Sequence, residues 1–276
     1  MCRVLHVSRS GYYSWLKGFN SGVDSQTEID AFLFNIKNAF EAGREKYGYR
    51  RVYSQLINDG VSCSISRVRR LMRANNIHPI IKKRSKNTTD SDHALAVAPN
   101  LLNRKFDVDE PNVCWVSDIT YIWTVSGWLY LAVFIDLFSR NIVGWSMDTS
   151  ISRKLIIDAF RNGVKCRKPD TGLIVHSDRG SQYASDEFKA TLLEVGSIQS
   201  MSRKGNCWDN AVSESFFASL KKETVYGKIY KNQQEAKMDV FEYIEVFYNK
   251  KRLHSTLGNM SPMDYENKYL DLQRAA

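Results

Sequence analysis

Three acidic residues occupy positions from which they could hold divalent metal ions. Asp118 and Asp178 each lie where a run of apolar, strand-forming residues stops, and a side chain at a strand end is rigidly placed. Glu214 lies inside a helical pattern, and 35 residues separate it from Asp178. If the two strands are neighbours in a sheet, the aspartates can converge and the glutamate can reach across from its helix.

The chemistry of such a trio follows from its ligand type. Carboxylate oxygens are hard ligands suited to magnesium or manganese, which keep open positions for water and phosphate oxygens. Two such ions roughly 3.5–4 Å apart can activate an attacking oxygen and stabilise the leaving one in an in-line displacement at phosphorus. The trio therefore predicts metal-dependent chemistry on phosphodiesters without a covalent enzyme intermediate.

Position alone leaves this assignment open. The chain has 30 acidic residues, and most acids in a protein are solvated surface groups. Asp136 ends another strand-like run and is a rival ligand. His176, two residues before Asp178, could orient a ligand or the scissile phosphate, or it could be a packed side chain.

The residues from 106 onward predict the elements that would position these acids. Runs rich in Val, Ile, Trp and Tyr, separated by turn residues, predict a three-stranded antiparallel meander, and later runs alternate between helix and strand. The order favours a mixed sheet flanked by helices. The predicted strands are 113–122, 127–136, 141–147, 173–176 and one near Ile198; the predicted helices are 152–166, 185–195, 211–225 and 232–248.

The N-terminal part carries the positive charge. The chain has a net charge of +9, yet residues 1–105 contain 18 Lys and Arg against 8 Asp and Glu, while residues 106–276 contain 21 against 22. Such a basic segment is suited to neutralising phosphates and releasing their counterions. A merely basic, solvated surface is the alternative interpretation.

Within this basic part, residues 27–59 predict two helices, and a third begins with Ser64 or Ser66 as its N-cap. A helix, a short turn and an arginine-rich helix are typical of helix-turn-helix DNA readers, although small helical bundles share the pattern. The predicted DNA contacts are Arg67, Arg69, Arg70 and Arg73 on the third helix, and Arg50 before it.

Composition excludes several classes of protein. The five cysteines are scattered and form no C-x-x-C pair, so a zinc site or a disulfide framework is not expected. No apolar run approaches the ~18–20 residues that span a bilayer, and the N-terminus lacks a secretory signal pattern. We therefore expect a cytoplasmic protein without membrane association.

Hydrophobic pattern and charge divide the chain into five predicted segments. The second would bind DNA, the third is a basic linker, and the fourth carries the three acids. The segments are a partial helical segment at 1–26, a helix-turn-helix-like domain at 27–78, the linker at 79–105, a catalytic core at 106–228 and a helical extension at 229–276.

Four stretches of sequence together resemble a known family. They are WVSDITYI around Asp118, HSDRGSQY around Asp178, SRKGNCWDNAVSESFFASLKKE around Glu214, and YNKKRLHSTLGNMSP near the end. These motifs resemble the DDE transposases of bacterial insertion sequences, specifically the OrfB-type product of the family numbered three. The 35-residue spacing between the second Asp and the Glu matches that family, and the resemblance covers residues 1 to about 268.

The resemblance implies a fold and a site. The fold would be α/β, with an RNase H-like mixed five-stranded sheet similar to that of retroviral integrases, preceded by an all-α helix-turn-helix region. Asp118, Asp178 and Glu214 match the family's catalytic, metal-binding acids, which implies two Mg²⁺ ions, with Mn²⁺ as a substitute. Lys221 matches a basic residue seven positions after the Glu, nearly two helical turns on, where it could hold phosphate.

Further contacts and partners are expected on the same basis. Arg179, Lys204 and Arg252 are predicted to contact DNA, although Arg252 and His254 could equally be structural turn residues. The expected partners are the terminal inverted repeats and the target DNA. A homo-oligomer, a dimer or larger, would hold two ends in a synaptic complex, and the product of an upstream reading frame is a further candidate partner.

The resemblance therefore implies a polynucleotidyl transferase that cleaves insertion-sequence ends and joins the 3′-hydroxyl to other DNA. Two rivals remain open from the sequence. A non-catalytic DNA-binding regulator of transposition would bind ends without strand transfer. An RNase H-like nuclease would cut branched DNA without joining and would not need a basic N-terminal unit.

Overall fold

The computed structural model describes residues 2, 5, 7–20, 22–79, 97–103, 106–203 and 210–275, with the side chains of 17–20 and 22–25 left aside. The chain forms two compact units, Met1–Ile80 and Ile81–Ala276. Each unit has its own buried side chains, and each is described by itself below.

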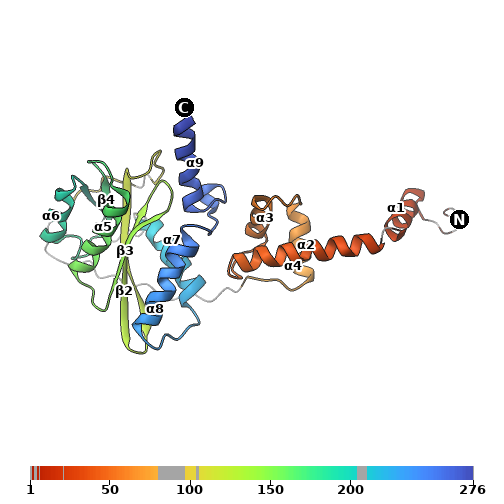
Figure 1. The fold of residues 1–276 in the computed structure, drawn as a ribbon, viewed down its shortest axis with the longest axis horizontal. Coiled ribbons are helices and arrows are strands. Elements are labelled where there is room, and N and C mark those ends of the chain that lie inside the picture. The colour runs from red at the N-terminus through yellow and green to blue at the C-terminus, as the bar shows by residue number, and fades with distance from the viewer. Residues whose placement is uncertain are drawn as a thin grey trace. The chain divides into compact units, whose positions relative to one another are not determined.

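The first unit is helical, as the sequence predicts (Figure 1). It consists of α1 (Arg9–Asn20), α2 (Gly22–Ala42), α3 (Tyr49–Asn58) and α4 (Ile65–Ala74). Ser64 is the N-cap of α4, because its Oγ accepts a hydrogen bond from the Arg67 backbone N–H at 3.3 Å. The small core contains Phe32, Ile36, Val52, Leu56, Val68 and Met72. Ile57, beside the buried Leu56, is 44% exposed.

The second unit is built on a five-stranded mixed sheet in the order β3-β2-β1-β4-β5. The first three strands form the predicted antiparallel meander, and β4 and β5 run parallel to β1. The strands are β1 (Cys114–Thr124), β2 (Gly127–Asp136), β3 (Ile142–Asp148), β4 (Ile174–Ser177) and β5 (Ile198–Met201). The predicted α/β class and sheet are confirmed.

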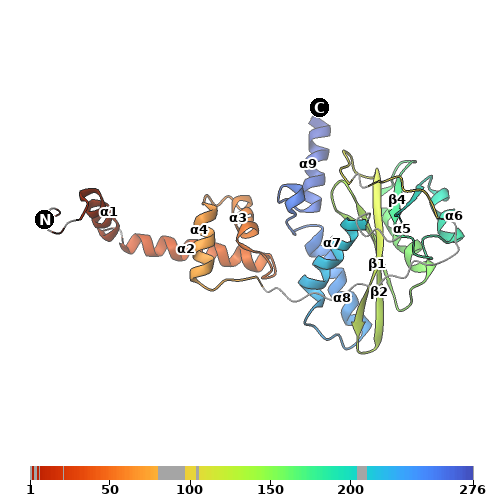
Figure 2. The ribbon, with the colours of Figure 1, turned by 180° about the vertical axis from the view of Figure 1, so that it is seen from behind.

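Helices cover both faces of this sheet (Figures 1 and 2). On one face lie α5 (Arg153–Arg167) and α6 (Asp186–Glu194), which bury a core centred on Trp115, Phe134 and Phe160. On the other lie α7 (Ala211–Leu220) and α8 (Gln233–Phe241), which contact β1 and β2. Large apolar side chains on both faces of β1 and β2 explain why these central strands are buried.

The C-terminal part differs from the sequence prediction. The predicted continuous helices 211–225 and 232–248 are α-helical only at first and end as π-helical turns, Lys221–Val225 and Glu242–Tyr248. A short 3₁₀ turn, Ser255–Leu257, and a further helix, α9 (Pro262–Ala275), follow. Helix α9 was not among the helices predicted from the sequence.

The predicted extension 229–276 is integrated with the sheet. The Asn249 side chain accepts from the Ile142 N–H at 3.0 Å and donates to the Ile142 carbonyl at 3.1 Å, which covers the outer edge of β3. Tyr230 also forms a bridge with Thr124 beside the β1–β2 turn. Among the helices that the structure describes, none is long and apolar enough to cross a membrane.

Candidate active site

The sheet register brings Asp118 and Asp178 to the same level. Val116 of β1 pairs with His176 of β4, and each aspartate lies two residues beyond that pair. Pairing between the described strands β1 and β4 stops at this pair. Asp118 therefore lies inside β1 rather than at its end, at the point where β1 loses its neighbour.

Backbone amides orient one oxygen of each aspartate. The Ile119 N–H donates to Asp118 Oδ1 at 2.7 Å, and the Gly180 N–H donates to Asp178 Oδ1 at 2.9 Å. A Cβ at residue 180 would lie 3.0 Å from Asp178 Oδ1, so glycine permits this close approach. The second oxygen of each carboxylate lies outside these two hydrogen bonds.

Glu214 comes from the first turn of α7. The start of this helix is tied to β1, because Asn210 Nδ2 donates to the Ser117 carbonyl at 3.4 Å, one residue before Asp118. Phe216 and Phe217 are buried, whereas Glu214 is half-buried. The packing of α7 on β1 thus brings Glu214 near enough for its charge to act on Asp118.

The three acids share one electrostatic environment. Burial raises the pKa of the Asp118 carboxyl well above its usual range, and the negative charges of Asp178 and Glu214 raise that pKa further. Burial also raises the pKa of Glu214. Lys221 opposes the shift of Asp118, while burial lowers the pKa of Lys221 itself. The charges of Asp178, Glu214 and Lys221 thus all act on Asp118, and the negative charge around it exceeds the positive charge.

A buried tyrosine supports the strand beneath this cluster. The Tyr183 hydroxyl and Ser117 Oγ are 2.8 Å apart, and Tyr183 is fully buried. Burial, followed by the charges of Asp118 and Asp178, raises the pKa of Tyr183 well above its usual range, so the phenol stays neutral. It can therefore fix the position of β1 without adding charge to the site.

The donor set fits a hard divalent cation. Its members are carboxylates with neighbouring negative charge, a combination that a bound cation would relieve. Within the described part of the chain, no group of three His, Cys, Asp or Glu side chains stands in a metal-holding arrangement.

The sequence comparisons now identify the family. An integrase core domain matches residues 108–207, a second integrase core domain matches 214–270, and a helix-turn-helix-like domain matches 28–85. The chain is 41% identical over 269 residues to an uncharacterized 31 kDa protein of insertion element IS600 from Shigella sonnei, covering 98% of both chains. It is 38% identical over 271 residues to transposase InsF of insertion sequence IS3A from Escherichia coli, covering 98% of this chain and 94% of that one.

This chain belongs to the IS3-family transposases. A third relative, the transposase of insertion sequence element IS904 from Lactococcus lactis, is 41% identical over 241 residues, covering 87% of this chain and 95% of its own. Together with the integrase core domain, these relatives support a DNA transposase activity of the polynucleotidyl transferase class. The predicted family, fold and enzyme class are therefore confirmed.

Asp136, the rival metal ligand, has a structural role in this transposase. Its Oδ2 accepts from the Asn112 N–H at 2.7 Å and its Oδ1 from the Phe138 N–H at 2.9 Å. Arg167 lies 3.7 Å from the same carboxylate and also pairs with Glu266 of α9. These bonds occupy both oxygens of Asp136, so the carboxylate joins β2, α5 and α9.

His176 is also packed. It is fully buried, and its Nδ1 lies 2.8 Å from Ser200 Oγ on β5. The same hydroxyl accepts from the Leu101 N–H at 2.9 Å. Of the two interpretations of His176, the structure favours the packed one, in which the imidazole links β4 to β5 and to the segment that precedes the sheet.

The predicted DNA contact of Arg252 is wrong. Arg252 is 5% exposed, and its Nε and NH2 donate to the two carboxylate oxygens of Glu223, both at 2.8 Å. NH2 also donates to Ser219 Oγ at 3.1 Å, and NH1 lies 3.2 Å from His254 Nε2. A guanidinium with these partners cannot reach a phosphate, so Arg252 and His254 are structural turn residues.

The remaining predicted DNA contacts lie in different surroundings. Arg179 is half-buried and its Nε donates to the Ser202 carbonyl at 2.8 Å, whereas Lys204 lies outside the described residues. On α4, Arg70 and Arg73 are exposed, while Arg67 stacks over Phe32 at 4.4 Å. Arg50 and Arg69 are exposed, and both lie over the Tyr49 ring, at 5.9 and 5.6 Å from its centre.

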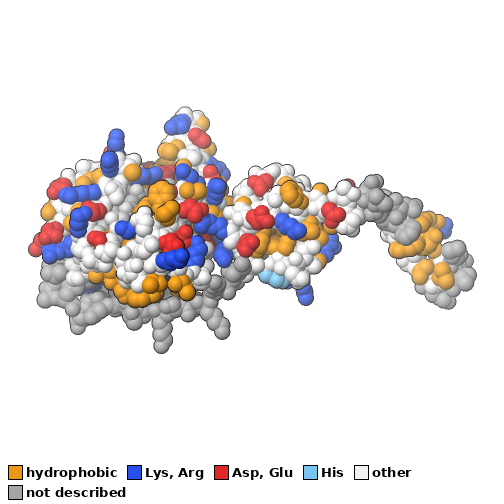
Figure 3. All heavy atoms as spheres, turned by 60° about the horizontal axis from the view of Figure 1, so that its bottom comes forward, with side chains coloured by type: hydrophobic (Ala, Val, Ile, Leu, Met, Phe, Trp, Pro, Cys, Tyr) orange, Lys and Arg blue, Asp and Glu red, His pale blue; other side chains and the backbone are white. Residues whose placement is uncertain are grey.

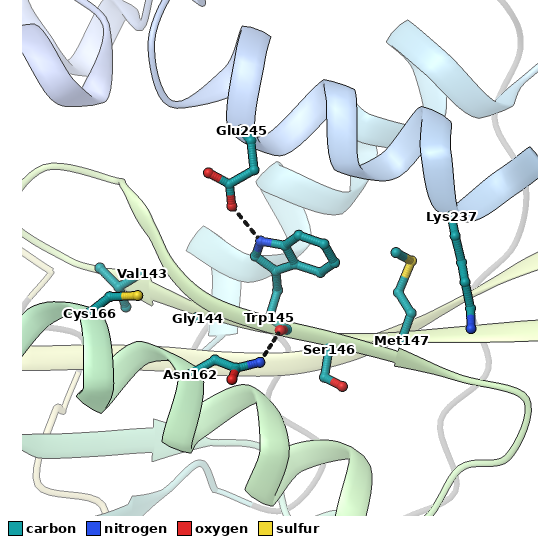
Figure 4. Close-up of a pocket in the computed structure, with 9 residues that line it drawn as sticks. All are labelled: Val143, Gly144, Trp145, Ser146, Met147, Asn162, Cys166, Lys237 and Glu245. Atoms are coloured by element: carbon teal, nitrogen blue, oxygen red, sulfur yellow. Dashed lines mark hydrogen bonds between the residues drawn. The ribbon is translucent and has the colours of Figure 1, made fainter. Parts of the chain in front are cut away.

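A pocket of about 430 Å³ lies away from the acids, along the edge strand β3 (Figure 4). Trp145 projects into it; its indole N–H donates to Glu245 at 2.7 Å, and Asn162 donates to its carbonyl at 3.2 Å. Since β2 separates β3 from β1, and no acid of the cluster lines this pocket, we assign it no catalytic role.

Proposed function

We propose that this transposase uses water to free a 3′-hydroxyl at an insertion-sequence end and then uses that hydroxyl to attack a second phosphodiester. The observation that carries the proposal is the β1–β4 register, which sets Asp118 and Asp178 at the same level of the sheet, with Glu214 near enough for its charge to act on Asp118. Family membership supports it independently.

In this proposal the three carboxylates hold two magnesium ions, with manganese able to substitute. When bound, the ions would activate the attacking oxygen and stabilise the leaving one. The backbone amides of Ile119 and Gly180 keep the aspartates oriented for this task. Lys221, the cation coupled to Asp118, binds the phosphate beside the acids and neutralises part of its charge.

The surrounding parts bring DNA to this centre. The helix-turn-helix-like unit, through Arg50, Arg69, Arg70 and Arg73, binds the terminal inverted repeat, and Arg179 and Lys204 contact DNA near the acids. A dimer or larger oligomer holds two ends together, and the product of an upstream reading frame is a further partner. We propose the five segment boundaries of the sequence analysis, and action on bacterial DNA in the cytoplasm, on the same basis.

A cleavage and strand-transfer assay on end-containing DNA tests the proposal. With Mg²⁺, Asp178→Asn and Glu214→Gln should each reduce both steps by about 100-fold or more, since each removes a metal-binding carboxylate. Asp170→Asn, which neutralises an exposed acid of the same unit, is the matched control and should retain wild-type activity. Wild-type rates in both site variants would refute the catalytic assignment.

The same assay separates the rival functions. A DNA-binding regulator would bind the ends but produce neither cleaved nor joined DNA with the wild-type chain. An RNase H-like nuclease would cut without joining. Cleavage followed by joining of the 3′ end, dependent on metal and on the three acids, is the outcome that our proposal requires.

A further inference from the structure

Three aromatic side chains form an exposed cluster on the β1–β2 hairpin. Tyr121, Trp123 and Trp128 are 39%, 57% and 42% exposed, respectively. The ring centroids of Trp123 and Trp128, which face each other in the strand register, are 4.8 Å apart, and those of Tyr121 and Trp128 are 5.1 Å apart. Both pairs are edge-to-face, so each ring fixes the orientation of its neighbour. We call these three residues the aromatic platform.

The hairpin that carries the platform is held in place at its turn. The Val125 N–H donates to the Tyr230 carbonyl at 2.9 Å, and Ser126 Oγ donates to the Lys231 carbonyl at 3.0 Å. Gln233 Nε2 donates back to the Ser126 carbonyl at 3.2 Å. The C-terminal segment thus anchors the turn, and the platform is a preorganised surface rather than part of a free loop.

The side chains of the platform are not part of the buried core of the second unit. On this face of the sheet the buried cluster ends at Ile119 and Tyr130, which are only partly buried. Tyr121 and Trp128 are the next residues on the same face, because side chains alternate along a strand. Figure 3 shows hydrophobic side chains gathered on the surface of this unit. Contiguous exposed aromatic side chains of this kind mark an interaction surface.

The platform adjoins the coupled acids. Lys221 Nζ lies 4.8 Å from the centre of the Tyr121 ring and is also electrostatically coupled to Asp118. Tyr121 and Trp123 are three and five residues along β1 from Asp118, odd separations that place their side chains on the opposite face of the sheet from Asp118. Lys221 is therefore the side chain that links the platform to the acids.

We propose that the aromatic platform binds unpaired nucleotides of the DNA strand that passes the acids, with Lys221 contacting the adjoining phosphate. This proposal rests on the proposed function, which supplies the DNA. Aromatic rings accept the flat face of any base, so the platform would separate or hold strands near the scissile phosphate without reading sequence. The cation within the surface favours a polyanion over a second copy of the chain as the occupant.

Binding is tested without metal, so that no catalysis intervenes. The full chain in EDTA is titrated with a duplex that carries a five-nucleotide single-stranded tail, with 2-aminopurine in the tail, and with the same duplex made blunt. The double variant Trp123→Ala/Trp128→Ala should weaken binding of the tailed duplex by about tenfold or more and abolish the quenching of 2-aminopurine. Binding of the blunt duplex should change by less than about twofold.

Two control variants make the result specific. Trp128→Phe keeps an aromatic face and should retain most of the quenching, which also guards against misfolding of the double variant. Phe241→Ala removes an aromatic side chain that is 52% exposed on α8 and should leave both duplexes bound as by wild type. If the double variant binds the tailed duplex and quenches 2-aminopurine as wild type does, the proposal that the platform binds unpaired nucleotides is refuted.

Two further outcomes also decide the question. If the double variant keeps tail binding but loses self-association in analytical ultracentrifugation, a second copy of the chain occupies the platform and the proposal is wrong. If the wild-type chain binds tails through the platform but shows no strand transfer with metal, the proposed function fails while the binding site stands.

Discussion

Two aspartates of this chain show how surroundings divide one residue type between two roles. Burial raises the pKa of Asp136, but two backbone N–H groups and Arg167 oppose that rise. Burial raises the pKa of Asp118 well above its usual range, and its two acidic neighbours add to the rise, which the Ile119 N–H and Lys221 oppose. The first arrangement stabilises a fold, whereas the second is costly unless a cation binds. Both aspartates end up in strands, so sequence position could not separate them.

This difference predicts opposite effects of two matched substitutions in the metal-free protein. Asp118→Asn should raise the melting temperature at pH 7, because it removes an ionised group that burial and like charge disfavour. Asp136→Asn should lower the melting temperature, because an amide NH₂ would then face a backbone N–H. Thermal denaturation followed by circular dichroism measures both, at about 2–4 °C per kcal/mol for a unit of this size.

The pH dependence provides a second readout for Asp118. Its pKa is raised in the folded state, so its ionisation destabilises the fold, and this cost grows as pH rises from the unfolded pKa of about 3.9 through the folded value. The gain from Asp118→Asn should therefore vanish at low pH, and Mg²⁺ should stabilise wild type more than the variant. A melting temperature for Asp118→Asn below that of wild type at pH 7 would contradict the argument.

At the scale of helices and strands, the sequence predicts the elements that the pattern of neighbouring residues defines. The strands fall within about two residues of their predicted ends, because alternation and turn residues define them locally. The position of Asp118 at the same level as Asp178 depends on the β1–β4 register, which contacts between residues distant in sequence determine. For α9 a local signal exists: Ser261 accepts from the Asp264 N–H at 3.2 Å, and Pro262 occupies the first turn.

The π-helical turn after α7 depends on a long-range contact that the sequence pattern does not contain. Arg252 binds Ser219 and Glu223, which flank Lys221 on either side. Both members of the Arg252–Glu223 ion pair are less than a tenth exposed, and the Tyr243 hydroxyl also donates to Glu223 at 2.8 Å. This network holds the turn that presents Lys221 to the acids.

Breaking this pair should therefore be costly. Arg252→Met should destabilise the fold by about 3–5 kcal/mol, because Glu223 would remain buried without its counter-charge. Arg153→Met, which breaks an exposed pair with Glu187, should cost about 0–1 kcal/mol. Adding Glu223→Gln to Arg252→Met should recover part of the loss. Urea unfolding monitors all three, and equal losses from Arg252→Met and Arg153→Met would show that the buried pair is not a major support.

At the scale of the whole molecule, most of the net positive charge and the three acids lie in different units. The three acids belong to the second unit, whereas the exposed arginines Arg70 and Arg73 belong to the first. The excess of basic residues over acidic ones lies entirely within residues 1–105. Because of this separation, substitutions in the first unit can alter DNA binding while the acids of the second unit stay unchanged.

The salt dependence of DNA binding measures the number of phosphate contacts that the first unit makes. For the full chain on end-containing duplex, Arg70→Ala/Arg73→Ala should lower affinity and reduce the slope of log K against log salt by about 1.8, since each lost phosphate contact contributes about 0.9. Arg161→Ala, an exposed arginine of the second unit that pairs with Glu194, should leave the slope unchanged. If the double variant keeps the wild-type slope, α4 does not contact phosphates, and the basic charge of the first unit is only a solvated surface.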